Sequence, residues 1–202
     1  MIKKLVALLF VLTTAFTLAA CGNDDSHDGH GGSDSKISAD EAFNQADIDF
    51  ATEMIQHHAQ ALSMVDLIDG KNVSSELTTL AEQIRMAQGP EIETLVGWLN
   101  DWSQPIPETM RDHANAHGDD MEMDSDMPGM MSAEDMKALG AAQGAEFEQM
   151  WLEMMIEHHE GAVEMAKTEK EDGKFADAID LANTIIAAQD AEIDQMRTMF
   201  GS

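Results

Sequence analysis

The sequence MIQHHAQALSM at residues 54–64 recurs as MIEHHEGAVEM at residues 155–165, and this repeat decides the fold. One offset kept along both segments indicates that a helix-turn-helix unit is used twice. Two helical hairpins with matching apolar faces predict an all-α fold, a four-helix bundle made of two duplicated αα-hairpins. The same offset also aligns Leu80 with Leu181, Ile84 with Ile185, Gln88 with Gln189 and Glu91 with Glu192.

The paired histidines of each repeat are predicted to lie inside this bundle. At about 100° per residue, they share the apolar side of their helix with the methionine that opens the repeat. On the second and fourth helices, one Gln and one Glu also face inward. Because buried polar groups need hydrogen-bond partners, we expect these four side chains to contact the histidines. They are Gln88, Glu91, Gln189 and Glu192.

The beginning of the chain has the features of an export signal. Residues 1–20 combine a basic start, an apolar run and a small-residue ending directly before Cys21, the only cysteine. This pattern resembles a bacterial lipoprotein signal peptide, in which Cys21 becomes the lipidated first residue. The apolar run is short for a membrane-spanning helix. We therefore expect an exported protein, lipid-anchored to the bacterial membrane and facing the periplasm or the cell surface.

The remaining chain divides by composition. Residues 21–40 consist largely of Gly, Asp, Ser and His, which is typical of a flexible tether. Residues 41–102 and 133–202 carry the two predicted hairpins. Between them, residues 103–132 form an acidic linker that is rich in Met and His. We expect residues 41–202 to form one bundle domain.

The excess of acidic over basic residues argues against some classes of binding partner. The chain has 39 acidic and 11 basic residues and a net charge of −28. We therefore do not expect nucleic acid as a partner, because phosphate binding needs a Lys/Arg surface. A nucleophilic hydrolase is not expected either, because no nucleophile-elbow motif is present and the only cysteine belongs to the signal.

The repeated Met-x-x-His-His-x5-Met pattern predicts a metal site. Imidazole nitrogen binds copper, zinc, iron or nickel, whereas thioether sulfur prefers Cu(I) or Ag(I). The mixed set favours copper in either oxidation state, with silver as a second ion. The alternative is that the methionines are flexible core residues and the histidines merely satisfy polar neighbours. The predicted ligands are Met54, His57, His58, Met64, Met155, His158, His159 and Met165.

The linker offers a second group of soft ligands. Beside two Met/His hairpins it predicts a flexible secondary site for copper or silver, and the alternative is a solvated acidic linker. Its candidate ligands are His113, His117, Met121, Met123, Met127, Met130 and Met131. His27 and His30 in the tether are weaker candidates.

Three functions compete at this point. The leading hypothesis is a non-enzymatic protein that sequesters copper or delivers it to a copper-transfer partner. The second is a ferritin-like di-metal oxidase or a cuprous oxidase. Ferritin-like di-metal sites use Glu-x-x-His, but Met54 and Met155 stand three residues before His57 and His158, which counts against this hypothesis. The third is a structural lipoprotein without a metal.

The two repeats, together with AAQDAEIDQM at residues 187–196, resemble the CopM-like family. The resemblance covers residues 41–200. It implies a ferritin-like helical bundle, a domain formerly of unknown function, that is linked to periplasmic copper binding and copper resistance. It also implies that the histidines and methionines of both repeats are the positions where copper would bind.

Overall fold

Four long helices and one short helix account for the described structure. They are α1 (Gln45–Asp66), α2 (Ser75–Asp101), α3 (Ala133–Ala141), α4 (Gly144–Asp172) and α5 (Ala176–Phe200). The computed structural model describes residues 37–38, 40–112 and 127–200. The predicted signal peptide, Cys21 and the tether residues His27 and His30 lie outside these ranges.

Polar side chains fix where the helices begin. The Asn44 side chain accepts the backbone N–H of Asp47 at 3.2 Å, and the Asp47 carboxylate accepts the backbone N–H of Asn44. This reciprocal pair satisfies two N–H groups at the start of α1. Ser132 caps α3 with the same kind of reciprocal pair, whereas the Ser74 side chain caps α2 by accepting the backbone N–H of Leu77 at 3.1 Å. In the turn between α1 and α2, Gly70 adopts a φ of +73°, which a residue without Cβ tolerates best.

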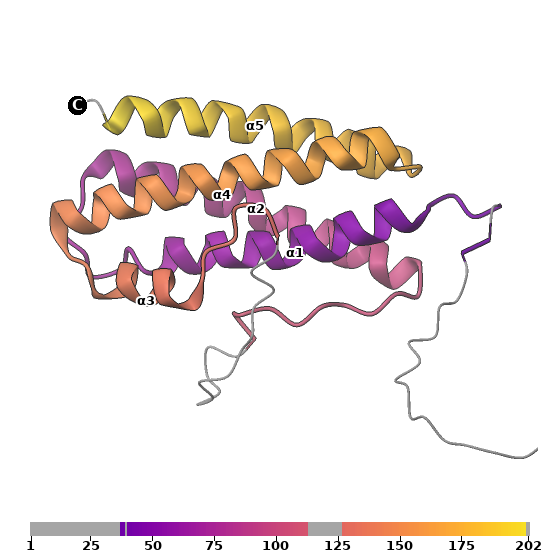
Figure 1. Ribbon diagram of the computed structural model, residues 1–202, viewed down its shortest axis with the longest axis horizontal. Coiled ribbons are helices and arrows are strands. Elements are labelled where there is room, and N and C mark those ends of the chain that lie inside the picture. The colour runs from indigo at the N-terminus through magenta and orange to yellow at the C-terminus, as the bar shows by residue number, and fades with distance from the viewer. Residues whose placement is uncertain (1–36, 39, 113–126, 201–202) are drawn as a thin grey trace, which may run out of the picture. The chain divides into compact units, whose positions relative to one another are not determined.

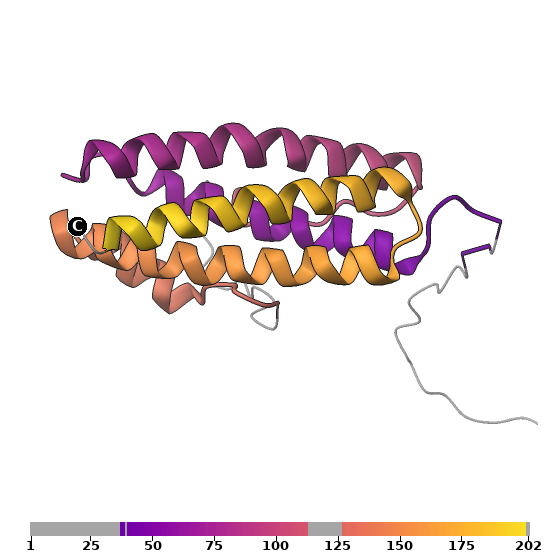
Figure 2. The same ribbon diagram turned by 90° about the horizontal axis from the view of Figure 1, so that it is seen from above.

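The helices pack as two hairpins joined face to face. α1 lies against α2, α4 lies against α5, and the hairpins meet where α1 packs on α4 (Figure 1 and Figure 2). α1 and α4 run in opposite directions along the bundle (Figure 1). The predicted all-α bundle is confirmed. The short α3, which the repeat does not predict, packs against α4.

The core consists of two apolar clusters separated by a polar level. Met64, Leu80, Trp151 and Met196 belong to one cluster. Phe50, Leu95, Ala166 and Ile185 belong to the other. On each long helix, the residues that contribute to one cluster are separated from those of the other by a polar stretch. These stretches hold His57 and His58 on α1, Gln88 and Glu91 on α2, His158 and His159 on α4, and Gln189 and Glu192 on α5. The sequence therefore places its histidines at mid-height in the bundle, with apolar packing above and below them.

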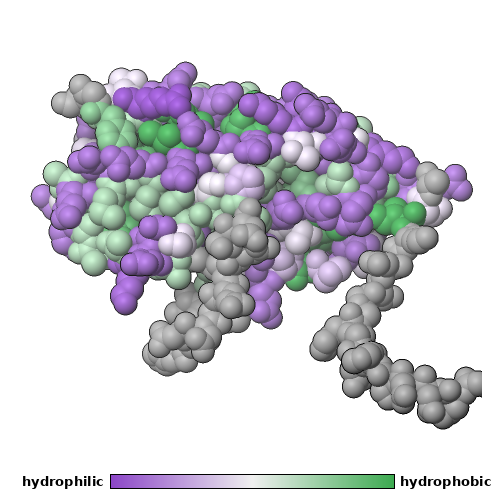
Figure 3. All heavy atoms as spheres, viewed as in Figure 1, coloured by the Kyte–Doolittle hydropathy of each residue, from purple (hydrophilic) through white to green (hydrophobic). Residues whose placement is uncertain are grey.

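Many hydrophilic side chains lie on the surface. Figure 3 shows them on one face, mixed with hydrophobic ones, in keeping with the net charge of −28. The large hydrophobic residues Met86, Ile106 and Phe200 are exposed, and scattered residues of this kind are normal. Among the residues that the structure describes, no helix has the length and apolarity needed to cross a membrane.

Two acidic side chains are buried where α1, α4 and the start of α5 meet. Asp47 Oδ1 accepts the backbone N–H groups of Lys174 and Phe175 at 3.0 and 2.8 Å, so its carboxylate is well satisfied. Glu169 lies next to it, only 1% exposed, and no N–H of the described residues donates to its carboxyl. Burial, followed by the hydrogen bond and the charge of Asp47, raises the pKa of Glu169 to about 8.

We predict that Glu169→Gln removes a pH dependence of stability. The unfolded chain releases this proton near pH 4.5, whereas the folded chain keeps it up to about pH 8. The stabilising contribution of Glu169 is therefore fully present below pH 4.5 and is lost as the pH rises to about 8. Relative to wild type, the variant should gain up to about 5 kcal/mol between pH 4 and pH 9, the linkage value for a pKa raised from 4.5 to about 8, measured by urea unfolding. The exposed Glu171→Gln serves as control, and an equal effect of Glu169→Gln at both pH values would contradict the raised pKa.

Candidate metal centre

Four histidines form a layer between α1 and α4. His57 and His58 lie on α1, His158 and His159 lie on α4, and all four are 0% exposed. The rings of His57 and His158 contact each other, with centroids 3.7 Å apart and planes inclined at 40°. The centroids of His158 and His159 lie 6.3 Å apart. The fold thus brings the histidines of both repeats together in one place, called the histidine layer below.

Two glutamates hold the outer edge of this layer. His58 Nε2 lies 2.7 Å from a carboxylate oxygen of Glu91 on α2, and His159 Nε2 lies 2.8 Å from Glu192 on α5. An ionised carboxylate only accepts, so each Nε2 carries the hydrogen. The predicted contact between these glutamates and the histidines is confirmed. The glutamines behave differently, because within the described part of the chain neither amide atom of Gln88 has a hydrogen-bond partner, and Oε1 of Gln189 has none either.

The inner ring nitrogens have no partner among the described residues. Within this part of the chain, Nδ1 of all four histidines is buried without a hydrogen bond, and so is Nε2 of His158. His57 Nε2 lies 3.0 Å from the carbonyl oxygen of Pro128 and donates to it, which leaves the lone pair of its Nδ1 free. A buried polar atom without a partner costs free energy. Several lone pairs left free in one layer are suited to hold an ion.

The histidine layer disfavours protons. Burial, and then the charge of His58, lower the pKa of His57 to about 3, although the Pro128 carbonyl acts in the opposite direction. Burial, and then the charges of His57, His159 and His58, lower the pKa of His158 well below its usual value. Both rings are therefore neutral near pH 7, which is the form that binds metal ions.

The four predicted methionine ligands flank the histidine layer on both sides. Met54 and Met165 belong to one apolar cluster, and Met64 and Met155 belong to the other. Because α1 and α4 are antiparallel, each side of the layer receives one methionine from each repeat. All four are buried, with exposures of 0% to 7%. The fold therefore gathers the eight predicted ligands around the middle of the α1–α4 interface.

Carboxylates and imidazoles by themselves do not complete a site here. Within residues 37–38, 40–112 and 127–200, no three His, Cys, Asp or Glu side chains converge as a metal-binding group. Glu91 and Glu192 each pair with one histidine. A metal ion bound in the histidine layer would need methionine sulfur beside imidazole nitrogen.

A short non-helical segment, residues 127–131, crosses α1 and α4 next to the histidine layer (Figure 1). We call it the strap. Gln60 holds its end, with Nε2 donating to the carbonyl oxygen of Met131 at 2.8 Å and Oε1 accepting its N–H at 2.7 Å. Met127 and Met131 are buried, and Met131 packs in the apolar core. The other linker candidates, His113, His117, Met121 and Met123, lie outside the described residues.

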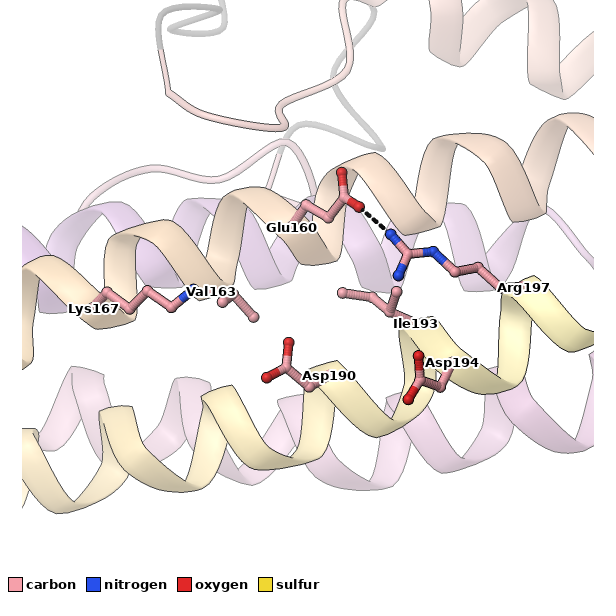
Figure 4. A pocket seen from close by; sticks show the side chains of 7 residues that line it. All are labelled: Glu160, Val163, Lys167, Asp190, Ile193, Asp194 and Arg197. Atoms are coloured by element: carbon pink, nitrogen blue, oxygen red, sulfur yellow. Dashed lines mark hydrogen bonds and ion pairs between the residues drawn. The ribbon is translucent and has the colours of Figure 1, made fainter.

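Two surface hollows lie near α4. One is a groove between α1 and α4 that ends at Pro128 of the strap, with Phe50 and Met165 among its lining residues. Its acidic lining residues are Asp49, Glu53, Glu164, Glu169 and Asp172. The other hollow lies between α4 and α5, where Glu160 points toward Arg197 at 2.6 Å (Figure 4). This second hollow holds none of the predicted ligands.

Comparison with known proteins identifies relatives of this arrangement. Residues 47–200 match the family described as "Domain of unknown function (DUF305)". A DUF305 protein from Streptomyces coelicolor, assigned as secreted, is 31% identical, with a TM-score of 0.65 over 76% of this chain and 91% of that one. A DUF305 fragment from Deinococcus radiodurans is 26% identical, with a TM-score of 0.67 over 80% and 99%.

CopM, whose structures include Cu(I)-bound, Cu(II)-bound, Ag-bound and apo forms, is also similar. Its Cu(I)-bound form is 29% identical to this chain, with a TM-score of 0.61 over 77% of this chain and 95% of CopM. The expected CopM-like resemblance is confirmed. No curated protein sequence matches the chain significantly.

We predict that His57 and His158 stay neutral in the metal-free protein from pH 7 down to about pH 5, because burial opposes their protonation. Nitrogen-15 NMR of the imidazoles, assigned with single His→Gln variants, measures both the charge and the tautomer. His57 should carry its hydrogen on Nε2, toward Pro128. A titration midpoint between pH 6 and 7 for either ring would contradict the burial seen in the structure.

Proposed function

The chain belongs to the DUF305 family, and from its histidine layer we propose that it binds copper between α1 and α4. The observation that carries the proposal is the set of buried Nδ1 atoms without partners, flanked by methionines from both repeats. The proposed ligands are drawn from Met54, His57, His58, Met64, Met155, His158, His159 and Met165.

The chemistry of these residues favours copper over harder ions. Thioether sulfur binds Cu(I) and Ag(I) strongly, and imidazole accommodates both Cu(I) and Cu(II). Glu91 and Glu192 hold histidine Nε2 atoms, which is the arrangement that orients metal-binding imidazoles in other proteins. The copper-bound and silver-bound forms of CopM support the same choice of ions.

We further propose that the protein sequesters or delivers copper and does not catalyse a reaction. Its predicted signal peptide and Cys21 would place it outside the cytoplasm, anchored by lipid, and the relative assigned as secreted supports the export. A copper-transfer protein would be its partner in delivery. The linker residues Met127, Met130 and Met131, with His113 and its neighbours, would form a secondary soft-metal site.

The first prediction from this proposal concerns the four histidines. We expect the chain from Gly22 onward to take Cu(I) from a chromophoric chelator under anaerobic conditions. A variant with all four replaced by Gln should lose at least about 100-fold in Cu(I) affinity, because the proposed nitrogen ligands are then absent. Circular dichroism checks that the variant is folded.

Parallel titrations with Cu(II), Zn(II) and Fe(II) test the choice of metal. Equal Cu(I) affinity in wild type and variant would contradict the proposed site. Tight Fe(II) binding with oxygen consumption would instead indicate a di-metal oxidase. Absence of binding by any ion would leave the histidines as polar core residues.

The second prediction tests the contribution of methionine sulfur to metal affinity separately from that of histidine nitrogen. Replacing Met54 and Met155 with Leu keeps their volume but removes two thioethers from the sides of the histidine layer. Cu(I) and Ag(I) affinity should fall by about tenfold or more, while Zn(II) affinity changes little, because sulfur selects soft ions. Met86→Leu, at a methionine that is 64% exposed, is the matched control. An equal loss for Zn(II) would indicate a packing defect.

A further inference from the structure

The strap is the non-helical cover of the histidine layer in the part of the chain that the structure describes. Apolar clusters close the layer along the bundle axis, and α2 and α5 close its outer sides through Glu91 and Glu192. Residues 127–131 lie across α1 and α4, where His57 donates to the Pro128 carbonyl. Opening the layer at the strap requires no helix to unwind.

Among the described residues, three side-chain hydrogen bonds hold the strap in place. The Gln60 side chain makes two hydrogen bonds with the backbone of Met131, and His57 makes one with Pro128. Apart from the turn bond from the N–H of Met130 to the carbonyl of Met127, the strap has no regular secondary structure. Its release would break these bonds and uncover Met127 and Met131, while the helices would keep their own hydrogen bonds.

Two glycines allow the strap to lie directly on α4. A Cβ on Gly161 would fall 2.0 Å from the Pro128 carbonyl oxygen, and a Cβ on Gly129 would fall 2.5 Å from the Glu157 carbonyl oxygen. Gly129 also has a φ of +73°, which disfavours any other residue. The same Cβ on Gly129 would lie 3.1 Å from the Cα of His158, so the strap backbone touches the histidine layer itself.

The two repeats differ in sequence at the aligned positions that contact the strap. The offset that aligns His57 with His158 also aligns Gln60 with Gly161. Gln60 binds the strap from α1, whereas Gly161 makes room for it on α4. The two halves of the bundle thus differ at the position where each meets the strap. Pro128 also lines the acidic groove and accepts a hydrogen bond from His57, so the strap lies between that groove and the histidine layer.

We propose that the strap is a latch, which must detach from Gln60 and Gly161 before a metal ion can reach the histidine layer. The proposal rests on the proposed copper binding for its ion. Its structural claim, that the strap controls access to His57 and His158, stands separately and is tested without metal.

The decisive variant is Gly161→Ala, whose methyl group occupies the place of the Pro128 carbonyl. The matched control is Gly97→Ala in α2, where a Cβ has nothing within 4 Å. Gln60→Leu releases the strap from the opposite helix and keeps the test valid if Gly161→Ala fails to fold. Each is made in the chain from Gly22 onward, which includes every residue of the compact unit 37–202.

Access to the histidine layer is measured in the metal-free protein, as the rate at which diethyl pyrocarbonate modifies His57 and His158. Peptide mass spectrometry follows the modification. We expect modification at least about tenfold faster in Gly161→Ala and in Gln60→Leu than in wild type and Gly97→Ala. Hydrogen exchange in a peptide that spans residues 127–131 should accelerate in the same two variants. Unchanged histidine modification in variants with faster strap exchange would overturn the latch.

The rate of Cu(I) transfer from a chromophoric chelator completes the test. Cu(I) transfer that is about tenfold faster in Gly161→Ala and in Gln60→Leu, with Gly97→Ala equal to wild type, supports a latch on copper uptake. Equal transfer rates in all four proteins would overturn the latch while leaving copper binding in place. Faster histidine modification without Cu(I) binding in any protein would support the latch and contradict the proposed function.

Discussion

The structure depends on burying four imidazoles at mid-height in a helical bundle. Each ring has two nitrogens, and the bundle supplies partners chiefly on the outer side, from Glu91, Glu192 and the Pro128 carbonyl. At His57 and His158 protonation does not satisfy the free nitrogens, because burial holds the pKa of these two rings low. Such a layer costs stability that the two apolar clusters must offset. That cost is understandable if the free lone pairs serve to bind an ion.

The antiparallel contact of α1 and α4 shapes this layer. It sets His57 of one repeat against His158 of the other, so that the two halves meet at a shared place rather than at two separate ones. It also distributes the methionines evenly, with Met54 and Met165 on one side of the layer and Met64 and Met155 on the other. The strap breaks this symmetry, because it bonds to His57, whereas neither nitrogen of His158 has a partner among the residues that the structure describes.

Sequence periodicity was sufficient to predict the bundle, the burial of the histidines and the glutamate contacts. Each of these follows from residues that recur at one offset on the same face of a helix. The strap could not be predicted, because its position depends on Gln60, Gly161 and Gly129, which join segments far apart in the chain. The mismatch of Gln60 with Gly161 was visible in the repeat, but nothing in either residue alone indicates a common neighbour. The buried pair of Asp47 and Glu169 likewise depends on where the α4–α5 turn meets α1.

The two glutamates also explain how a buried layer can hold a cation. A cation bound at Nδ1 of His58 or His159 would lie one imidazole ring away from an ionised carboxylate, whose negative charge stabilises it. The carboxylates themselves remain 14% and 16% exposed, so they avoid the full cost of burial. Among the described residues, no carboxylate is hydrogen-bonded to the ring of His57 or His158. Protonation of these two rings is therefore stabilised less. The layer therefore combines neutral nitrogens at its centre with negative charge at its edge, a distribution that favours a soft metal ion over a proton.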